Sequence, residues 1–154
     1  MAKETKSFDP KNHKKNDLLG RKTAKKLFSK NWNITLEDND DEYDTDLIGC
    51  HNNISFFVEA SVLGSFRKYY YIEGWLGIYQ RKIKRFQKHL DVNEKIYFAI
   101  CNATGKKVAL LKVTQDILNM EQITVNHQPT VRSFDNNPED IIAVPKKYWQ
   151  LYEV

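Results

Sequence analysis

The sequence contains only two cysteines, Cys50 and Cys101, among its 154 residues. Two thiols cannot build a disulfide framework, and they cannot form a zinc site without other ligands. The chain has no run of the roughly 18 apolar residues that a membrane-spanning helix needs, and no apolar secretion signal follows Met1. These absences favour a cytoplasmic protein without a membrane partner.

Several catalytic motifs are missing as well. The sequence has no glycine-rich phosphate loop, no GxSxG nucleophile elbow and no HExxH zinc motif. Its four histidines, His13, His51, His89 and His127, show no ligand spacing and are interpreted as surface residues. The motifs of nucleotide-binding loops, serine hydrolases and zinc proteases are therefore not available to this chain.

Length and composition predict one globular domain. Apolar residues make up 41% of the chain and charged residues 29%, which is too apolar for a disordered protein. Residues 1–16 are rich in Lys and Asn without apolar periodicity, and are expected to form a flexible basic arm. Residues 17–154 are expected to form a single domain, because a chain of this size rarely builds two cores.

The net charge of +4 is distributed unevenly. Residues 1–31 contain ten Lys or Arg and three acids, residues 37–46 contain seven acids and no base, and residues 64–88 contain seven bases and one acid. Two basic blocks on either side of an acidic block fit a polyanion partner together with a cation site. The charges alone leave open the alternative that these are solvated faces without such a role.

Hydrophobic periodicity predicts an α/β fold with a mixed central sheet flanked by helices. Helices are expected at 18–30, after an Asp17 N-cap, and at 75–90, 115–120 and 145–151. Strands are expected at 32–37, 43–49, 54–62, 95–102, 107–114 and 141–144. The segments 63–74 and 121–139 are expected to be irregular, the first with a short strand at 69–72. The strand at 95–102 is apolar on both faces and is expected to be central.

The strands at 43–49 and 54–62 are expected to pair as a hairpin. The intervening Asn52-Asn53 suits a tight two-residue turn, because Asn tolerates positive φ. Cross-strand partners then have residue numbers that sum to 105. Every second residue from Ile54 to Val62 is apolar, so this face of the strand must point into the core.

The opposite face of the hairpin is acidic. In this register Asp46 lies across from Glu59 and Asp44 across from Ser61, and alternation brings all four to one face. Clustered carboxylates repel each other unless a cation lies between them, and their hard oxygens suit Mg²⁺ or Mn²⁺. The pattern predicts a metal site of Asp44, Asp46 and Glu59. A solvent-facing polar sheet face without metal is the alternative, and a one-residue slip would remove the cluster.

The expected order of elements, αβββαβ, resembles the core of the PD-(D/E)XK nuclease superfamily, the restriction-endonuclease-like fold that includes Holliday junction resolvases. The family motif is an acid on the second core strand and acid-x-Lys on the third. Residues 43–49 resemble the first part, with Asp46 as the best match, and residues 57–61 resemble the second, with Glu59 as the acid. Residues 20–27 resemble the first helix of the resolvase-like branch, and the resemblance covers roughly residues 17–114.

This resemblance implies a restriction-endonuclease-like fold and a Mg²⁺- or Mn²⁺-dependent nuclease acting on DNA. Asp46 and Glu59 are then the catalytic metal ligands, with Asp44 as an auxiliary ligand. Attack by an activated water would leave a 5′-phosphate. By analogy with resolvases, the small size and the basic arm are compatible with a homodimer.

Two features depart from the family pattern. Ser61 occupies the position of the motif lysine, and the first helix has Lys25 or Lys26 where family members often carry an acid. The motif lysine helps to position or activate the attacking water, and serine cannot supply its positive charge. Lys82 on the next basic segment is the candidate replacement, and Lys68 is the second. The alternative is a catalytically inactive nuclease-like module that binds nucleic acid or a protein partner.

Basic and aromatic residues surround the predicted site in sequence. The residues expected to contact phosphates are Arg21, Lys22, Lys25, Lys26, Arg67, Lys68, Arg81, Lys84 and Arg85. The aromatic residues Tyr69, Tyr70, Tyr71 and Trp75 lie next to Arg67 and Lys68. Such rings can stack on exposed nucleotides, but core or sheet packing is the favoured interpretation.

Overall fold

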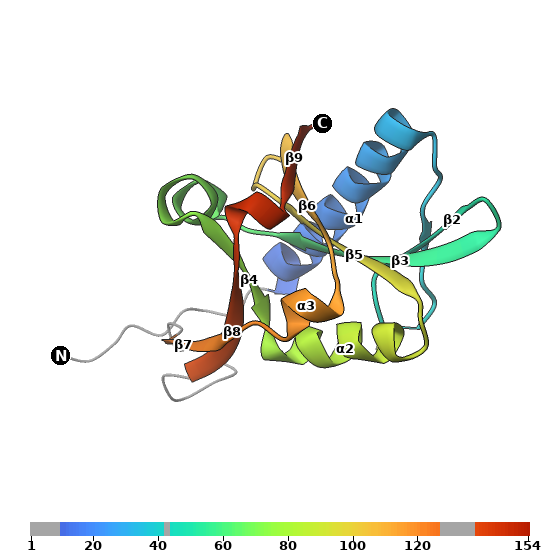
Figure 1. Cartoon of the computed structure of the whole chain (residues 1–154). Helices are drawn as coiled ribbons and strands as arrows, with labels where there is room; N and C mark the ends of the chain where they lie inside the picture. Colours follow the sequence, from blue (N-terminus) through green and yellow to red (C-terminus); the bar gives the residue numbers. More distant parts are fainter. Residues whose placement is uncertain (1–9, 42–43, 127–137) are drawn as a thin grey trace.

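The computed structural model describes residues 10–41, 44–126 and 138–154 (Figure 1). The helices are α1 (Pro10–Trp32), α2 (Gln80–Asp91) and α3 (Gln115–Leu118), with a π-helix η1 (Arg67–Glu73) and a 3-10 turn η2 (Lys146–Tyr148). The strands are β1 (Glu37–Asp38), β2 (Leu47–His51), β3 (Ile54–Val62), β4 (Trp75–Tyr79), β5 (Lys95–Cys101), β6 (Lys107–Lys112), β7 (Gln122–Asn126), β8 (Pro138–Pro145) and β9 (Gln150–Glu153).

The central sheet has the strand order β1-β2-β3-β5-β6-β9. Its neighbours are antiparallel except for β3 and β5, which are parallel. Between these two strands the chain leaves the sheet, forms η1, β4 and α2, and returns beside β3. β4 belongs to a second, antiparallel sheet with the order β4-β8-β7. The predicted α/β class, with a mixed central sheet and flanking helices, is confirmed.

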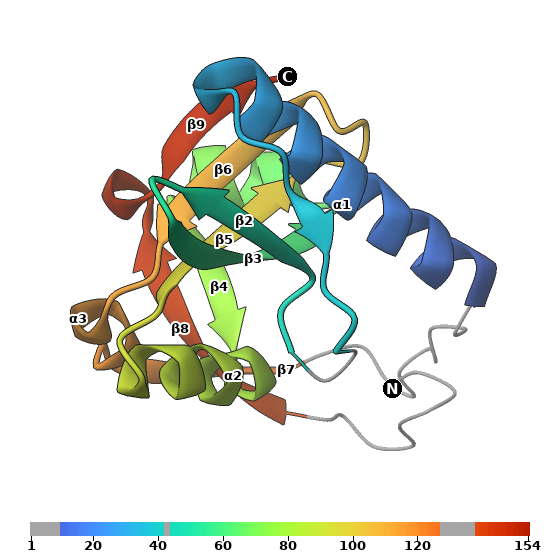
Figure 2. The same ribbon diagram turned by 90° about the vertical axis from the view of Figure 1, so that its right-hand side faces the viewer.

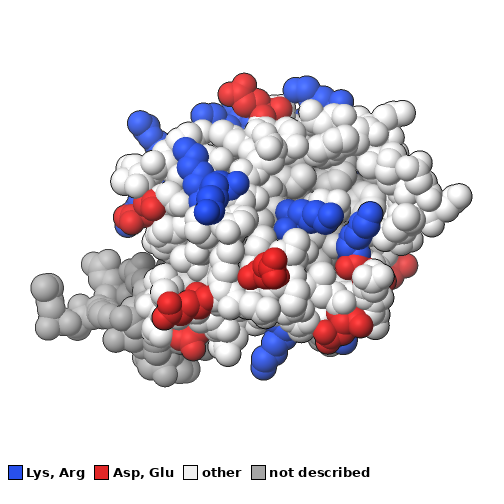
Figure 3. Space-filling view, in the orientation of Figure 1, with Lys and Arg blue, Asp and Glu red and all other residues white. Residues whose placement is uncertain are grey.

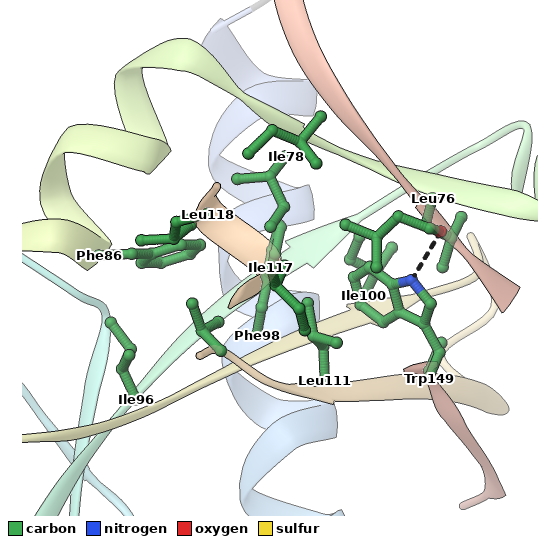
Figure 4. Close-up of a cluster of buried hydrophobic side chains, with 14 of the residues drawn as sticks. Leu76, Ile78, Phe86, Ile96, Phe98, Ile100, Leu111, Ile117, Leu118 and Trp149 are labelled. Atoms are coloured by element: carbon green, nitrogen blue, oxygen red, sulfur yellow. Dashed lines mark hydrogen bonds between the residues drawn. The ribbon is translucent and has the colours of Figure 1, made fainter. Parts of the chain in front are cut away.

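Hydrophobic cores lie on both faces of the central sheet. On one face α1 packs Leu27 and Phe28 against β3, β5 and β6. On the other face Phe86 of α2 and Ile117 of α3 pack with the second sheet against β5 and β6 (Figure 4). Figure 2 shows α1 and α2 on opposite sides of β3 and β5. Because β5 contributes buried residues to both cores, its predicted central position is confirmed.

The β2–β3 hairpin has the predicted turn and register. Asn52 and Asn53 adopt φ values of 52° and 64°, and the ladder runs from His51↔Ile54 to Leu47↔Val58. β3 has the predicted bounds, but β2 begins only at Leu47 instead of residue 43. The acidic residues that were expected inside the strand therefore precede it.

The N-terminal helix is longer than predicted. Residues 10–16, predicted as part of the flexible arm, are helical, and arm residues 1–9 lie outside the described residues. Pro10 suits the first turn of a helix, and residues 11–19 contain neither Gly nor Pro. Asp17 is not an N-cap but an interior residue, whose Oδ2 lies 3.3 Å from Arg21 Nε. Trp32 ends α1 instead of starting a strand.

Residues 75–79, predicted as the start of a helix, form strand β4. Leu76 and Ile78 are fully buried, whereas Trp75, Gly77 and Tyr79 are partly exposed, which is a two-residue alternation. Pairing with β8 stabilises this conformation. The preceding segment forms the π-helix η1, so the predicted strand at 69–72 is also wrong.

The C-terminal third differs from prediction where strands pair over long distances. β5, β6, α3 and β8 occur close to their predicted positions. Residues 122–126, predicted as irregular, form β7 beside β8. The helix predicted at 145–151 is absent: residues 146–148 form the 3-10 turn η2, and β9 begins at Gln150 and pairs with β6. Local periodicity does not encode such partners.

None of the helices in the described part of the chain combines the length and the apolarity required to cross a membrane.

Replacing Leu111 with Ala should lower the free energy of unfolding by about 2–5 kcal/mol, because Leu111 is fully buried and its truncation leaves a cavity. Urea denaturation followed by circular dichroism measures the loss. Leu18→Ala is the matched control, since Leu18 is 57% exposed on α1 and should change stability by less than about 0.5 kcal/mol. Equal losses in the two variants would contradict this core.

Candidate functional site

A cavity of about 540 Å³ opens between the end of β3, the helix α2 and the second sheet. Its ionisable lining residues are Asp17, Asp46, Glu59, Arg81, Lys82, Arg85 and the tyrosines Tyr69 and Tyr79. Ser61, Trp75 and Gly77 also line it. The cavity therefore combines acids and bases with aromatic rings, and it contains both acids that match the nuclease motif.

Glu59 is the buried acid of this cavity, with a side chain that is 1% exposed. Its Oε2 accepts hydrogen bonds from Lys82 Nζ at 2.9 Å and from Arg85 Nη1 at 2.8 Å. Lys82 and Arg85 are three residues apart on α2, so both reach the same side of the helix. Burial raises the pKa of Glu59, but the Lys82 charge and the contact with Asp46 lower it more, and the pKa falls below its usual range.

Asp46 lies next to Glu59, directly before β2. Its Oδ2 accepts a hydrogen bond from the Ala60 backbone N–H at 2.9 Å, and its Oδ1 lies 3.5 Å from Arg21 Nη2 of α1. Burial, followed by the negative charge of Glu59 and the hydrogen bond to it, raises the pKa of Asp46 to about 7. Near neutral pH the pair therefore holds a proton that a bound cation would displace.

One oxygen of Glu59 is left without a donor once Asp46 is ionised. Glu59 Oε1 is buried, and apart from the proton that Asp46 carries near neutral pH, no donor in the described part of the chain reaches it. Burying a carboxylate oxygen without a hydrogen-bond partner costs free energy. Glu59 Oε1 and the carboxylate of Asp46 together offer the hard oxygen ligands that Mg²⁺ or Mn²⁺ prefers. Within residues 10–41, 44–126 and 138–154, no three His, Cys, Asp or Glu side chains could hold a metal together. A cation here would keep several waters.

Asp44, predicted as a third ligand on this face, lies elsewhere. It precedes β2, so strand alternation does not direct its side chain. Asp44 Oδ1 pairs with His89 Nε2, while His89 Nδ1 lies 3.1 Å from Glu94 Oε1. His89 is buried against the Phe57 ring and is not the surface residue that was predicted. This cluster ties the segment before β2 to the C-terminal end of α2, away from the cavity lining.

The predicted phosphate contacts fall into two groups. Arg21 and Lys25 pair with Asp38 at 3.5 and 3.1 Å, and Arg85 pairs with Glu59. The exposed residues are Lys22, Lys26, Arg67, Lys68, Arg81 and Lys84. Figure 3 shows Lys and Arg interspersed with Asp and Glu on one face of the molecule. Of the nine predicted residues, Arg81 and Arg85 line the cavity.

Three aromatic residues form a wall of the cavity. Trp75, favoured as a core or sheet residue, lines it together with Tyr69, and their ring centroids are 5.1 Å apart. Tyr79 and Gly77 were not among the predicted site residues. The sequence signal for both was the alternation of residues along 75–79, in which every second side chain is buried. This alternation indicates a strand, but the segment was interpreted as the start of a helix.

No protein-family model matches the chain, and a search of the curated proteins finds no significant match. A functional assignment therefore depends on the geometry of the cavity.

The Asp46→Asn variant should gain stability relative to the wild type as pH rises from about 4 to about 7. The pKa of Asp46 is about 7 in the folded protein against an ordinary 3.8, so the folded state binds this proton more tightly than the unfolded chain. That stabilisation is complete at low pH and is lost as pH rises through the folded pKa. Asn has no such proton to lose. Urea denaturation at several pH values, without divalent cations, measures the difference.

The control for this experiment is Asp40→Asn, because Asp40 is an exposed acid outside the cavity. Its unfolding free energy should follow the pH dependence of the wild type. An Asp46→Asn curve parallel to the wild-type curve would contradict the raised pKa.

Proposed function

We propose that the protein is a metal-dependent nuclease of the PD-(D/E)XK type, which hydrolyses phosphodiester bonds in DNA. The observation that carries the proposal is the convergence of Asp46, Glu59 and Lys82 on one cavity, with Lys82 Nζ 2.9 Å from Glu59 Oε2. Two acids that can share a cation, with an ammonium beside them, are groups that support metal-assisted phosphodiester hydrolysis.

The order of elements supports the proposal. α1 precedes β1, β2 and β3, and α2 and β5 follow, as in the restriction-endonuclease-like core that the sequence resembles. β4 is an insertion before α2 and pairs in the second sheet. Asp46 stands directly before the second strand and Glu59 lies near the end of the third, where the resemblance expects the two acids.

Lys82 is the proposed substitute for the motif lysine. Ser61, at the motif position, lines the same cavity but carries no charge. Lys82 reaches Glu59 from α2, and its side chain remains 15% exposed. Lys68, the second candidate, is not part of the cavity lining, and its Nζ lies 5.4 Å from the centroid of the Tyr69 ring.

Asp46 and Glu59 would hold Mg²⁺ or Mn²⁺ through Asp46 and the Oε1 atom of Glu59 that has no donor. When bound, such a cation neutralises charge on the phosphodiester and makes a water more acidic. Its charge also favours the ionised form of Asp46, which otherwise retains its proton near neutral pH.

The residues of α2 supply the remaining chemistry. Lys82 donates one hydrogen to Glu59 Oε2 and has two further N–H groups for the attacking water or a phosphate oxygen. Arg85 shares Glu59 Oε2 and has further donors that can bind a second phosphate oxygen. Arg81, which is exposed at the cavity, binds the neighbouring phosphate of the strand.

Lys82→Met should lower the rate of DNA cleavage in Mg²⁺ by about 100- to 10,000-fold, since it removes the donor that positions the water. Glu59→Gln should abolish cleavage. The assay offers the wild type single-stranded, duplex and branched DNA, and RNA, with Mg²⁺ or Mn²⁺. Lys88→Met is the matched control, because Lys88 is an exposed lysine of the same helix that does not line the cavity.

A failure of the wild type to cleave any of these nucleic acids would contradict the proposal. DNA binding that weakens steeply with salt, without cleavage, would instead support the second candidate function. That function is a catalytically inactive nuclease-like module that binds nucleic acid, and Ser61 at the motif position is the observation that favours it.

Metal binding can be tested without a nucleic acid. At ten times its dissociation constant, Mn²⁺ should stabilise the wild type by about 1.4 kcal/mol, which raises Tm by about 4 °C. Asp46→Asn should lose most of this shift, because it removes one of the two carboxylates. Asp40→Asn should keep it. A wild-type Tm that does not change with Mn²⁺ would exclude the carboxylate pair as a metal site.

A further inference from the structure

The cavity has a second wall, formed by β4, that the proposed hydrolysis does not use. Trp75, Gly77 and Tyr79 alternate along this strand and line the cavity, whereas Leu76 and Ile78 between them are fully buried. The strand therefore presents an aromatic residue, a glycine and another aromatic residue in succession toward the open space. Each is fixed by a neighbour that is anchored in the core.

The glycine leaves room for the Trp75 ring to pack over the strand. A Cβ atom at Gly77 would lie 3.0 Å from Ile141 Cδ1 and 3.4 Å from Trp75 Cζ3, so these two side chains already occupy the space above Gly77. The Tyr69 ring, from η1, packs on Trp75 at a tilt of 56°. Trp75 therefore packs against the Tyr69 ring, and the two rings together form an aromatic surface of the cavity.

The same cavity is also lined by the acids and bases of the proposed site. Asp46 precedes β2, Glu59 lies on β3, and Lys82 and Arg85 lie on α2. A volume of about 540 Å³ is in the range of pockets that enclose a small ligand. A cavity lined by aromatic rings and by bases beside a proposed cation site matches one nucleotide, with its base on the rings and its phosphate at the bases and the cation.

We infer that this cavity takes one unpaired nucleotide of single-stranded DNA, whose base stacks on Trp75 while the phosphate lies at Lys82, Arg85 and the cation held by Asp46 and Glu59. The inference rests on the proposed function and specifies its substrate. A base inside a duplex is covered on both faces by its neighbours, so it cannot stack on Trp75 unless it is first unstacked. Single strands, frayed ends and flaps offer such a base directly.

The first test compares cleavage of a labelled single strand with cleavage of the duplex of the same sequence. The wild type should cleave the single strand at least about tenfold faster. Trp75→Leu should lose about tenfold in kcat/KM on the single strand, chiefly through KM, since stacking supports binding. Trp75→Phe, which retains a ring, should restore most of the activity. Tyr71→Leu is the control, because Tyr71 lies on η1 but does not line the cavity.

The second test measures binding in the absence of divalent cations, so it does not depend on catalysis. Trp75 is one of three tryptophans, and Trp149 is buried. A single-stranded oligonucleotide should quench the fluorescence of the wild type and of Lys88→Met, whose lysine does not line the cavity, but not that of Trp75→Phe. Duplex DNA should quench less at equal concentration. Far-ultraviolet circular dichroism confirms that each variant is folded.

The outcomes separate this inference from the proposed function. Equal cleavage of duplex and single strand, with no loss in Trp75→Leu, would overturn the inference and leave the nuclease intact. Quenching that depends on Trp75 without any cleavage would support the nucleotide pocket and count against the nuclease. Quenching that persists in Trp75→Phe would overturn the pocket, because the signal would then come from another tryptophan.

Discussion

The arrangement of this molecule depends on the burial of one carboxylate. Glu59 sits on a central strand, almost without exposure, and could not remain ionised there without Lys82 and Arg85. Both bases come from α2, so the ion pairs fix how that helix crosses the sheet. Asp46 is fixed from the other side, by the Ala60 N–H and by Arg21 of α1. The helices on the two faces of the sheet are thereby connected through two neighbouring acids.

The same interactions explain why much of the basic charge is not available at the surface. Arg21, Lys25, Lys82 and Arg85 all pair with acids of the described chain. The acidic block at 37–46 thus neutralises part of the first basic block, and Glu59 engages the second. The alternation of charged blocks along the sequence reflects in part the pairing of these blocks inside the fold.

Local patterns predicted the parts of the fold that depend on neighbours in sequence. Asn52 and Asn53 fix the hairpin, and the apolar run of β5 fixes its central position. Several errors arose where pairing joins distant segments. Residues 75–79 have a pattern that also suits a helix, and their strand conformation depends on pairing with β8, as that of β9 depends on β6. Of the candidate site residues, the structure brings Asp46, Glu59 and Lys82 to one cavity. Hairpin register and motif suggested the two acids, and the missing motif lysine suggested Lys82. Asp44 and His89 were misplaced, because an irregular segment brings them together.

The pairing of β4 with β8 has a consequence for synthesis of the protein. Residues 75–79 leave the ribosome long before residues 141–145, which supply their hydrogen-bond partners. Until then both edges of β4 lack a partner strand, and Leu76 and Ile78 lack the cover that they have in the finished fold. Open apolar edges of this kind are sites of aggregation. The nascent chain therefore passes through a stage in which this strand can aggregate with other chains.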